Sequence, residues 1–331
     1  MLKPYLKIAA VTVLAASAGT VANAQSVKGT VTLKNIPEGI AVNPFNNRIY
    51  VAVPTFGAKP YDYLQEIDGN TDTVTKTIQI PPFAYAVAID PLTSTIFVGG
   101  TSEDKNGVIQ SEVVTVSDHT KQVLGTIHVS STPGDGIQGL AVNSLTGDLY
   151  VSNGSDNEID VIHSGKVTTR IPVAGEPFGV AVNPFSNQVY AALINGNVAV
   201  INAATNTVTA TTAVGTSDAG IAVNFFTGNV YTTNQVFTES STVGVLGAAG
   251  NVITNIPVGN TPIGIDVDPV TNLAFVANTQ DGTVSVINQA TNTVSATLPV
   301  SGLFVAANFV TGKVYVGSDN SSPIVTVISE K

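Results

Sequence analysis

The chain has 331 residues, of which 13 are lysine or arginine and 23 are aspartate or glutamate, and it contains no cysteine. Its formal net charge of −10 disfavours nucleic acid as a partner, because a polyanion is repelled at long range. The lack of cysteine excludes disulfides, thiolate metal sites and cysteine nucleophiles.

Residues 1–24 have the pattern of a secretory signal peptide. Lys3 and Lys7 come before an apolar run over residues 8–22, and small residues end at Ala24, where cleavage is expected. The run is about 15 residues, shorter than the roughly 20 that span a bilayer, so we expect no transmembrane anchor. The predicted mature domain is residues 25–331, in the periplasm, at the cell surface or outside the cell. Without Lys3 and Lys7 it has 11 basic and 23 acidic side chains, a net charge of −12.

The next segment, VKGTVTLKNIP at 27–37, has the β-branched composition of a strand and precedes a series of seven repeats. Each repeat begins with an apolar strand that ends in Asn or Asp, followed by a turn and a second strand such as LYVSN (149–153) or VYTTN (230–234). Spacings of 40 to 53 residues separate the shared positions, which are Asn43, Asp90, Asn143, Asn183, Asn224, Asp268 and Asn308. A period of this length with several strands in each copy indicates propeller blades.

Each repeat predicts four strands, which we call A to D from the centre outwards. Strand C is clearest as NVAVIN (197–202) and TVSVIN (283–288), and strand D as TVTATTAVG (207–215). The last repeat ends after its strand C, PIVTVIS (323–329), so the segment at 27–37 is predicted to pair there as the missing strand D. The predicted fold is an all-β, seven-bladed β-propeller with four-stranded blades, whose ring is closed by the N-terminal strand.

These phrases resemble the YVTN-repeat family of exported seven-bladed β-propellers, the YncE-like proteins. The resemblance rests on GIAVNP (39–44), on LYVSN, VYTTN and AFVAN (274–278), and on NAATNTVTAT (202–211) and NQATNTVSAT (288–297), and it covers the predicted mature domain. It implies an exported propeller but no single chemistry, because such relatives include binding proteins, surface proteins and lactonase-like enzymes.

The strand order places the D–A and B–C connections on one face of the ring and the A–B and C–D turns on the other. The B–C loops at 54–63, 101–107 and 235–242 are long, whereas the A–B turns are short and uniform. Variable loops on a rigid scaffold usually carry function, so we predict a site on the D–A/B–C face, at the mouth of the central channel.

The residues just before strand A should surround that mouth, and we call them the mouth ring: Glu38, Tyr85, Gln138, Phe178, Ala219, Ile263 and Leu303. With two carboxylates from the D–A connections, the predicted ligand-binding residues are Glu38, Tyr85, Gln138, Glu176, Phe178 and Asp218. A mostly apolar ring with few polar groups suits a small ligand or a side chain of a partner. Further acidic residues expected on this face would attract cations or a basic partner, or serve solubility: Glu103, Asp104, Asp135, Asp156, Glu158, Glu239, Asp281 and Asp319.

Asp266 stands where strand A of the other repeats carries alanine, and a carboxylate near the axis must be solvated, paired or bound to a metal. Channel water is one alternative. A divalent cation such as Ca²⁺ is the other, because hard cations take several oxygen ligands. His119, His128 and His163 are expected on outer strands, where they would not converge on one metal. No cofactor is predicted otherwise.

The leading interpretation is an exported, non-catalytic binding scaffold that acts through its D–A/B–C face. An enzyme is not favoured, because the chain has no GxSxG, P-loop or Rossmann fingerprint. The first alternative is a metal-dependent, lactonase-like hydrolase with its site at the channel mouth, and the second is a structural component of the cell surface or envelope. The expected partner is a protein, an envelope glycan or a small molecule, and the expected state is a monomer.

Overall fold

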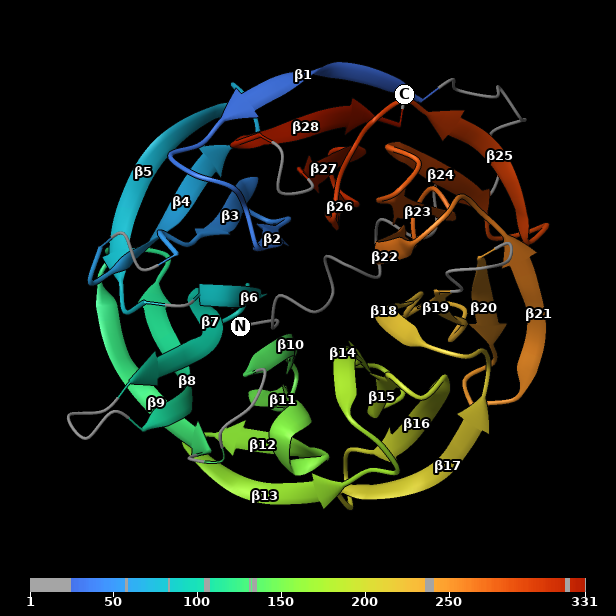
Figure 1. The fold of residues 1–331 in the computed structure, drawn as a ribbon, viewed down its shortest axis with the longest axis horizontal. Coiled ribbons are helices and arrows are strands. Elements are labelled where there is room, and N and C mark those ends of the chain that lie inside the picture. The colour runs from blue at the N-terminus through green and yellow to red at the C-terminus, as the bar shows by residue number, and fades with distance from the viewer. Residues whose placement is uncertain are drawn as a thin grey trace, which may run out of the picture.

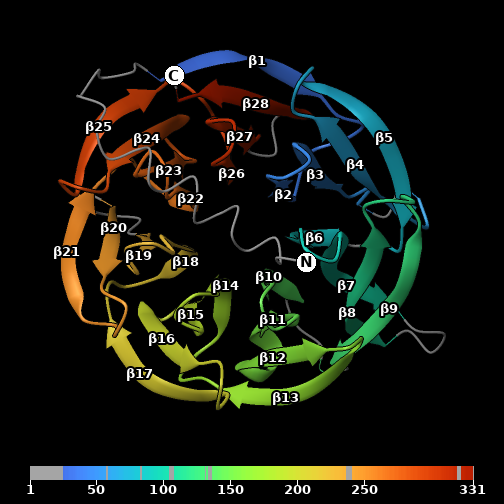
Figure 2. The same cartoon turned by 180° about the vertical axis from the view of Figure 1, so that it is seen from behind.

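Seven four-stranded antiparallel sheets are arranged as blades around a common axis (Figure 1, and from behind in Figure 2). The computed structural model describes residues 25–330 except 57–58, 83, 104–107, 131, 133–135, 236–240 and 319–321, and for Glu103 and Asp218 it describes the backbone alone. The predicted signal peptide, residues 1–24, lies outside the described residues.

The strands of each blade follow one another from the axis outwards. Blade 1 consists of β2 (Gly39–Asn43), β3 (Arg48–Val53), β4 (Asp62–Asp68) and β5 (Thr73–Ile80). Blade 2 consists of β6 (Ala84–Asp90), β7 (Thr95–Glu103), β8 (Ile109–Ser117) and β9 (Val123–Ser130). Blade 3 consists of β10 (Ile137–Asn143), β11 (Asp148–Asn153), β12 (Glu158–His163) and β13 (Lys166–Pro172), with the 3₁₀ turn η1 (Gly154–Asp156) before β12.

Blades 4 to 7 repeat this order. Blade 4 consists of β14 (Pro177–Asn183), β15 (Gln188–Leu193), β16 (Asn197–Asn202) and β17 (Thr207–Ala213). Blade 5 consists of β18 (Asp218–Val223), β19 (Val230–Asn234), β20 (Thr242–Leu246) and β21 (Val252–Pro257). Blade 6 consists of β22 (Pro262–Asp268), β23 (Leu273–Asn278), β24 (Thr283–Asn288) and β25 (Thr293–Leu298). Blade 7 consists of β26 (Phe304–Asn308), β27 (Lys313–Gly317), β28 (Ile324–Ser329) and β1 (Ser26–Thr32).

The N-terminal strand closes the ring. β1 pairs antiparallel with β28, from Ser26 opposite Ser329 to Thr32 opposite Ile324, so the outermost strand of the last blade comes from the start of the chain. Figure 1 shows the blue β1 alongside the red β28. The predicted fold class and its mode of closure are therefore confirmed.

The Asn or Asp that marks each repeat closes the A–B turn. All seven side chains accept an N–H from the residue two positions later, as Asn224 does from Phe226 at 3.0 Å. Where this residue is asparagine, its Nδ2 group also donates to the next blade, for example from Asn224 to Gln289 Oε1 at 2.8 Å. These buried side chains thus hold both the turn and the ring together.

The hydrophobic core lies between blades. Seven clusters of described apolar side chains each join two neighbouring sheets. The aromatic residue of strand B contributes to this core in six blades. It is fully buried in each of them, as Tyr50, Tyr150, Tyr190, Tyr231, Phe275 and Tyr315. Sheets that pack on both faces explain the long runs of valine, isoleucine and alanine in strands B and C.

Candidate functional site

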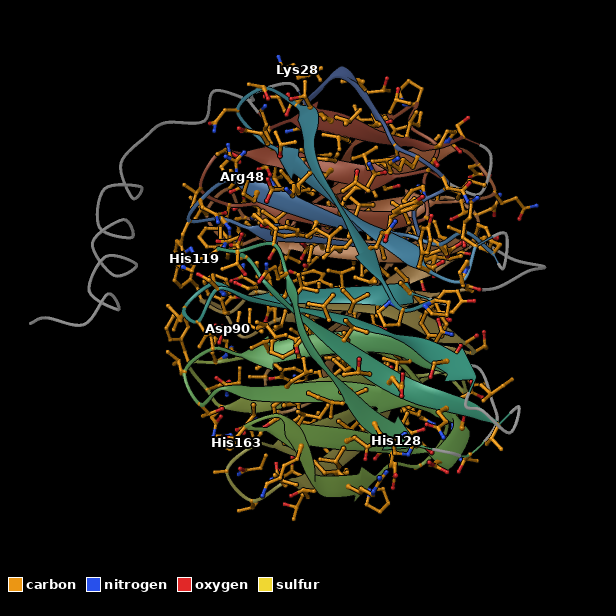
Figure 3. The ribbon with its side chains drawn as sticks, turned by 90° about the vertical axis from the view of Figure 1, so that its left-hand side faces the viewer. Lys28, Arg48, Asp90, His119, His128 and His163 are labelled. Carbon is orange, nitrogen blue, oxygen red and sulfur yellow. The ribbon has the colours of Figure 1, made fainter. Side chains whose placement is uncertain are left out.

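The two ends of the ring have the predicted connections. In Figure 3, Arg48 and Asp90 of the A–B turns and His119 and His163 near the C–D turns lie at the same end of the molecule. The B–C connections, with the D–A connections, therefore lie at the other end. Among them 54–61, 104–108 and 235–241 are long, as predicted, and 318–323 in blade 7 is another long one that the sequence analysis did not single out.

Five residues of the mouth ring lie at β-bulges of the innermost strands, where the register of pairing shifts. The pairing of strand A with strand B shifts register between Ala84 and Ala86, and in the corresponding segments of blades 3 to 6. The mouth-ring residues that lie between the paired positions at these register shifts are Tyr85, Gln138, Phe178, Ala219 and Ile263. β-Bulges redirect side chains and are enriched beside binding sites, so strand A of five blades is shaped to present a side chain near the axis.

Glycines next to the mouth ring let neighbouring blades come close together. A Cβ atom added at Gly39 would overlap the carbonyl oxygen of Tyr85 in the next blade, and Gly139 would meet Phe178 in the same way. The same relation joins Gly179 to Ala219, Gly220 to Ile263 and Gly264 to Leu303. The glycine of the GIAV phrase is thus needed for backbone approach, and this contact fixes the spacing of the mouth ring.

Hydroxyl groups of strand B support these bulges. Thr233 accepts the N–H of Gly220 at 2.8 Å and donates to the carbonyl oxygen of Ile263 in the next blade at 3.0 Å. Ser152 has the first of these roles in blade 3, where it accepts the N–H of Gly139 at 2.6 Å. In blades 3 and 5 the serine or threonine of strand B therefore supports the backbone of the mouth ring.

Glu38 and Tyr85 are brought together from adjacent blades. Asp62, which is buried, accepts the N–H of Thr55 at 2.7 Å and that of Ala84 at 2.9 Å, and so fixes the chain next to Tyr85. Burial raises the pKa of Tyr85, and the negative charges of Glu38 and Asp62 raise it further. Burial also raises the pKa of Glu38. A half-buried carboxylate and a half-buried phenol therefore share one side of the mouth.

The other predicted ligand-binding residues lie on or beside the innermost strands of blades 3 to 5. Phe178 is half-buried, as are Gln138, Ile263 and Leu303, so this part of the ring is mostly apolar. Glu176 packs on Gly154 in the B–C connection of blade 3, since a Cβ there would lie 3.1 Å from its Cγ atom. The side chain of Asp218 lies outside the described residues. The same is true of the side chain of Glu103 and of Asp104, Asp135, Glu239 and Asp319 on the predicted acidic face.

Asp266 connects blades 6 and 7. Its Oδ1 accepts the N–H of Val267 at 2.8 Å, and its Oδ2 accepts the N–H of Ala307 on β26 at 2.8 Å. Burial raises the pKa of Asp266 to about 6, although the two backbone N–H groups oppose this effect. Both carboxylate oxygens are thus bonded to backbone groups, which is a third environment besides the channel water and the metal of the sequence analysis. Among the described residues, no group of three His, Asp or Glu side chains is placed to hold a metal ion.

A second polar cluster on this face, between blades 2 and 3, was not predicted as a unit. Arg170 donates to Glu158 at 2.9 Å, to the buried Asp160 at 3.1 Å and to the carbonyl oxygen of Val129 at 2.8 Å. Burial raises the pKa of Asp160 to about 6. The alternation of Glu158 and Asp160 on one strand opposite Arg170 on the next was the available signal. Because these charges satisfy one another, this cluster stabilises the blade pair.

The three histidines lie where the sequence placed them. His119 is in the turn between β8 and β9, His128 is on the outer strand β9, and His163 ends β12 with its Nδ1 2.8 Å from Asp148 Oδ1. All three are exposed. They do not form a shared site.

An open groove of about 310 Å³ lies between blades 6 and 7, apart from the mouth ring. Val27 and Thr30 of β1 form one wall, and the segment Pro299–Val300–Ser301 forms another. Its volume is near the lower end for small-ligand sites. The groove shares no lining residue with the mouth ring.

The comparisons with known proteins agree with the fold. A solved structure with the same architecture is the hydrazine synthase of Kuenenia stuttgartiensis, with a TM-score of 0.71 at 18% identity over 94% of this chain and 98% of that chain. At this level of identity the likeness shows the fold alone. No family model and no curated protein matches the chain, so the resemblance to the YVTN-repeat family stays a prediction. The described residues contain no helix long and apolar enough to cross a membrane.

Proposed function

We propose that the protein is an exported, non-catalytic binding scaffold that holds a cationic, partly aliphatic group of its partner at the mouth ring. The observation that carries the proposal is the placement of Glu38 beside Tyr85 in a ring that is otherwise largely apolar. A lysine side chain or another primary amine has the matching chemistry, since its ammonium group pairs with a carboxylate and its methylene stem covers apolar surface.

The setting of these residues supports binding rather than catalysis. Tyr85 lies in a bulge whose flanking strand is fixed by Asp62, so the side chain is presented on rigid elements. The pKa of Glu38 is raised by burial alone, which a cationic ligand would reverse by stabilising the carboxylate. Glu38 has the one carboxylate among the described side chains of the mouth ring, and the nearby carboxylate of Asp62 already accepts two backbone N–H groups, so the chemistry of the ring suits recognition.

Fluorescence polarisation with two labelled peptides, one alternating lysine and leucine and the other glutamate and leucine, tests this function on residues 25–331. We expect binding of the lysine peptide only, weakened at least tenfold by Glu38→Gln. The matched control is Asp281→Asn, which removes one negative charge from the same face. The carboxylate of Asp281 accepts the backbone N–H of Asn260 at 2.8 Å, away from the mouth ring, so this variant should bind the lysine peptide as the unsubstituted protein does. The proposal would be rejected if the unsubstituted protein and Glu38→Gln bound the lysine peptide equally, or if neither peptide bound.

The hydrolase alternative is tested separately by calorimetry with Ca²⁺. A cation at Asp266 would compete with the N–H groups of Val267 and Ala307, which are the partners of both oxygens. Stoichiometric Ca²⁺ binding that is lost in Asp266→Ala would favour the hydrolase. If addition of Ca²⁺ produced no heat of binding, the binding scaffold would be favoured over the hydrolase.

A further inference from the structure

The A–B turns carry a second ring of exposed side chains, at the end of the axis opposite the mouth ring. In every blade the residue two positions after the Asn or Asp of the repeat is large and apolar. We call this ring the A–B rim: Phe45, Leu92, Leu145, Phe185, Phe226, Val270 and Val310. Six of these residues are 38% to 55% exposed, and Leu92 is half-buried.

Aromatic rings extend the A–B rim toward the axis. Phe225 of blade 5 and Phe309 of blade 7 replace the proline found in four of the turns, and their ring centroids lie 5.9 Å apart. The ring centroid of Phe225 lies 4.7 Å from that of Phe226 and 5.7 Å from that of Phe185. The aromatic rings thus form one contiguous apolar area across blades 4, 5 and 7.

The turns themselves do not require these side chains. The Asn or Asp side chain closes each turn, and the residue that follows the rim residue is always polar and uncharged: Asn46, Thr93, Thr146, Ser186, Thr227, Thr271 and Thr311. Single exposed apolar residues are ordinary, but a contiguous set on one face marks an interaction surface.

We propose that the A–B rim docks onto the surface of a zwitterionic lipid bilayer. Seven equivalent turns lie at one end of the ring, so a partner that contacts all of them at once must be flat (Figure 3). The rim residues and their polar neighbours carry no charge, which suits apolar insertion. The cations Arg48, Lys121 and Lys313 near this end are paired with carboxylates, which weakens their attraction to anionic headgroups. A second copy of the chain is less suitable, because two domains with a net charge of −12 repel each other.

The path of the chain also points to a membrane on this side. β1 begins with Ser26 opposite Ser329, and Ser329 pairs with Lys313, which follows the A–B turn of blade 7. The chain therefore enters the ring at the rim end. Residues 8–22, the apolar part of the predicted export signal, precede it in the sequence. Before the predicted cleavage after Ala24, a signal peptide bound to a membrane would have the rim as the nearest end of the propeller. This argument rests on export, whereas the exposure of the rim does not.

Flotation with phosphatidylcholine vesicles tests the proposal on residues 25–331, which contain every described strand and lack the apolar residues 8–22. We expect the unsubstituted domain to float with the vesicles and the triple variant Phe45→Ser, Phe185→Ser, Phe226→Ser to bind at least tenfold more weakly. The matched control is Phe56→Ser, Ile109→Ser, Ile194→Ser, which removes three exposed apolar side chains at or beside the B–C connections, at the opposite end of the ring, and should float normally.

A fluorescence readout keeps the test independent of folding defects, because the chain has no tryptophan. Phe185→Trp should shift its emission to the blue when vesicles are added, and Phe56→Trp, at the opposite end of the ring, should not. Sedimentation velocity without vesicles measures self-association. Failure of the unsubstituted domain to float, equal loss in rim and control variants, or rim-dependent dimers without vesicle binding would each overturn the proposal.

Discussion

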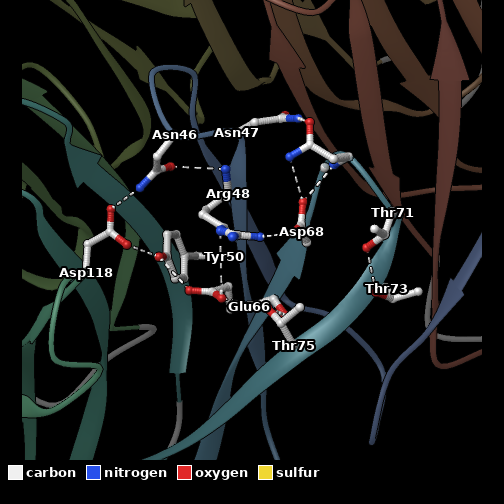
Figure 4. Close-up of polar contacts among 12 residues, drawn as sticks. Asn46, Asn47, Arg48, Tyr50, Glu66, Asp68, Thr71, Thr73, Thr75 and Asp118 are labelled. Carbon is white, nitrogen blue, oxygen red and sulfur yellow. Dashed lines mark hydrogen bonds and ion pairs between the residues drawn. The ribbon is translucent and has the colours of Figure 1, made fainter.

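The hydroxyl group of Tyr50 donates to the carboxylate of Asp118 in the next blade. Lys121 contacts both partners, at 2.6 Å from the Tyr50 hydroxyl and 2.7 Å from Asp118, and also forms an ion pair with Glu66. Figure 4 shows the Tyr50 hydroxyl between the carboxylates of Asp118 and Glu66. Asn43 adds a bond of 2.8 Å to the other oxygen of Asp118. The tyrosine of the YVTN-like strand is thus part of a buried polar cluster that fastens blade 1 to blade 2.

Tyr50→Phe should lower the free energy of unfolding by about 1–3 kcal/mol, because it removes a donor shared by the buried carboxylates of Asp118 and Glu66. Tyr150→Phe is the matched control. Tyr150 is equally buried, but its hydroxyl has no hydrogen-bond partner among the described residues, so the loss of that oxygen should cost little or be stabilising. Urea denaturation of both variants measures the difference. Equal destabilisation would show that the two hydroxyl groups do not differ in this way.

Asn224→Asp separates the two functions of the Asn in the repeat. The aspartate can still accept from Phe226 and Thr227, but it cannot donate to Gln289, and it places a charge against that oxygen. We expect a loss of roughly 1–3 kcal/mol in unfolding free energy. Asp268→Asn is the reciprocal change. Within the part of the chain that the structure describes, Asp268 Oδ2 is buried without a hydrogen-bond partner, so this variant should be neutral or more stable in the same urea titration.

Glu38→Gln should lower the pKa of Tyr85. The charge of Glu38 is one of the causes that raise this pKa, and the amide removes that charge while keeping the shape. Ultraviolet difference titration measures the change, with Tyr85→Phe used to subtract the other tyrosines. An unchanged titration of Tyr85 would mean that the two groups are not close enough to interact, and the proposed amine site would lose its main support.

The contribution of Asp266 to the free energy of unfolding should fall as pH rises from about 4 to about 6. The ordinary pKa of this carboxyl group is 3.8, and burial raises it to about 6 in the folded protein. In this window the folded state binds the proton and the unfolded state does not, so a rise in pH favours unfolding. The effect is at most roughly 3 kcal/mol and smaller where water reaches the half-buried side chain.

Comparison with Asp266→Asn isolates this contribution. The unfolding free energy of the unsubstituted protein should fall relative to that of Asp266→Asn between pH 4 and pH 7, as measured by urea denaturation at each pH. Asp68→Asn should show the opposite sign at lower pH, because bonds from Asn70 and Arg48 lower the pKa of Asp68. Parallel curves for the unsubstituted protein and Asp266→Asn would contradict the raised pKa.

The sequence predicted the ring, its seven blades and its closure because these depend on a period and on a missing last strand. It also placed Tyr85, Gln138 and Phe178 near the axis, since their position relative to the repeat is constant. It could not show that Tyr85 lies beside Glu38, because that depends on the bulge between Ala84 and Ala86. A local insertion of this kind leaves no mark in an apolar strand pattern.

Asp266 and the A–B rim show a different limit. The departure of Asp266 from the alanine pattern was visible, but its bonds to Val267 and Ala307 depend on how near β26 comes to β22. The apolar residue in each A–B turn was visible too. Its exposure was not, because the sequence does not show which side chains beside a turn a neighbouring blade will cover, and the arrangement of the blades leaves Phe45 and Phe185 uncovered.

Removal of β1 should open the ring. A chain that begins at Leu33 leaves the edge of β28 unpaired, with Val325 and Val327 losing the cover of Val31 on the same blade. Exposed strand edges recruit other chains, so we expect a lower urea midpoint and concentration-dependent aggregation. A synthetic peptide of residues 25–35 should restore the monomer by pairing with β28, and a peptide of the same composition in scrambled order should not. Sedimentation velocity with and without the two peptides measures this. A truncated chain that stays monomeric and unfolds at the original urea midpoint would mean that the strand closes the ring without stabilising it.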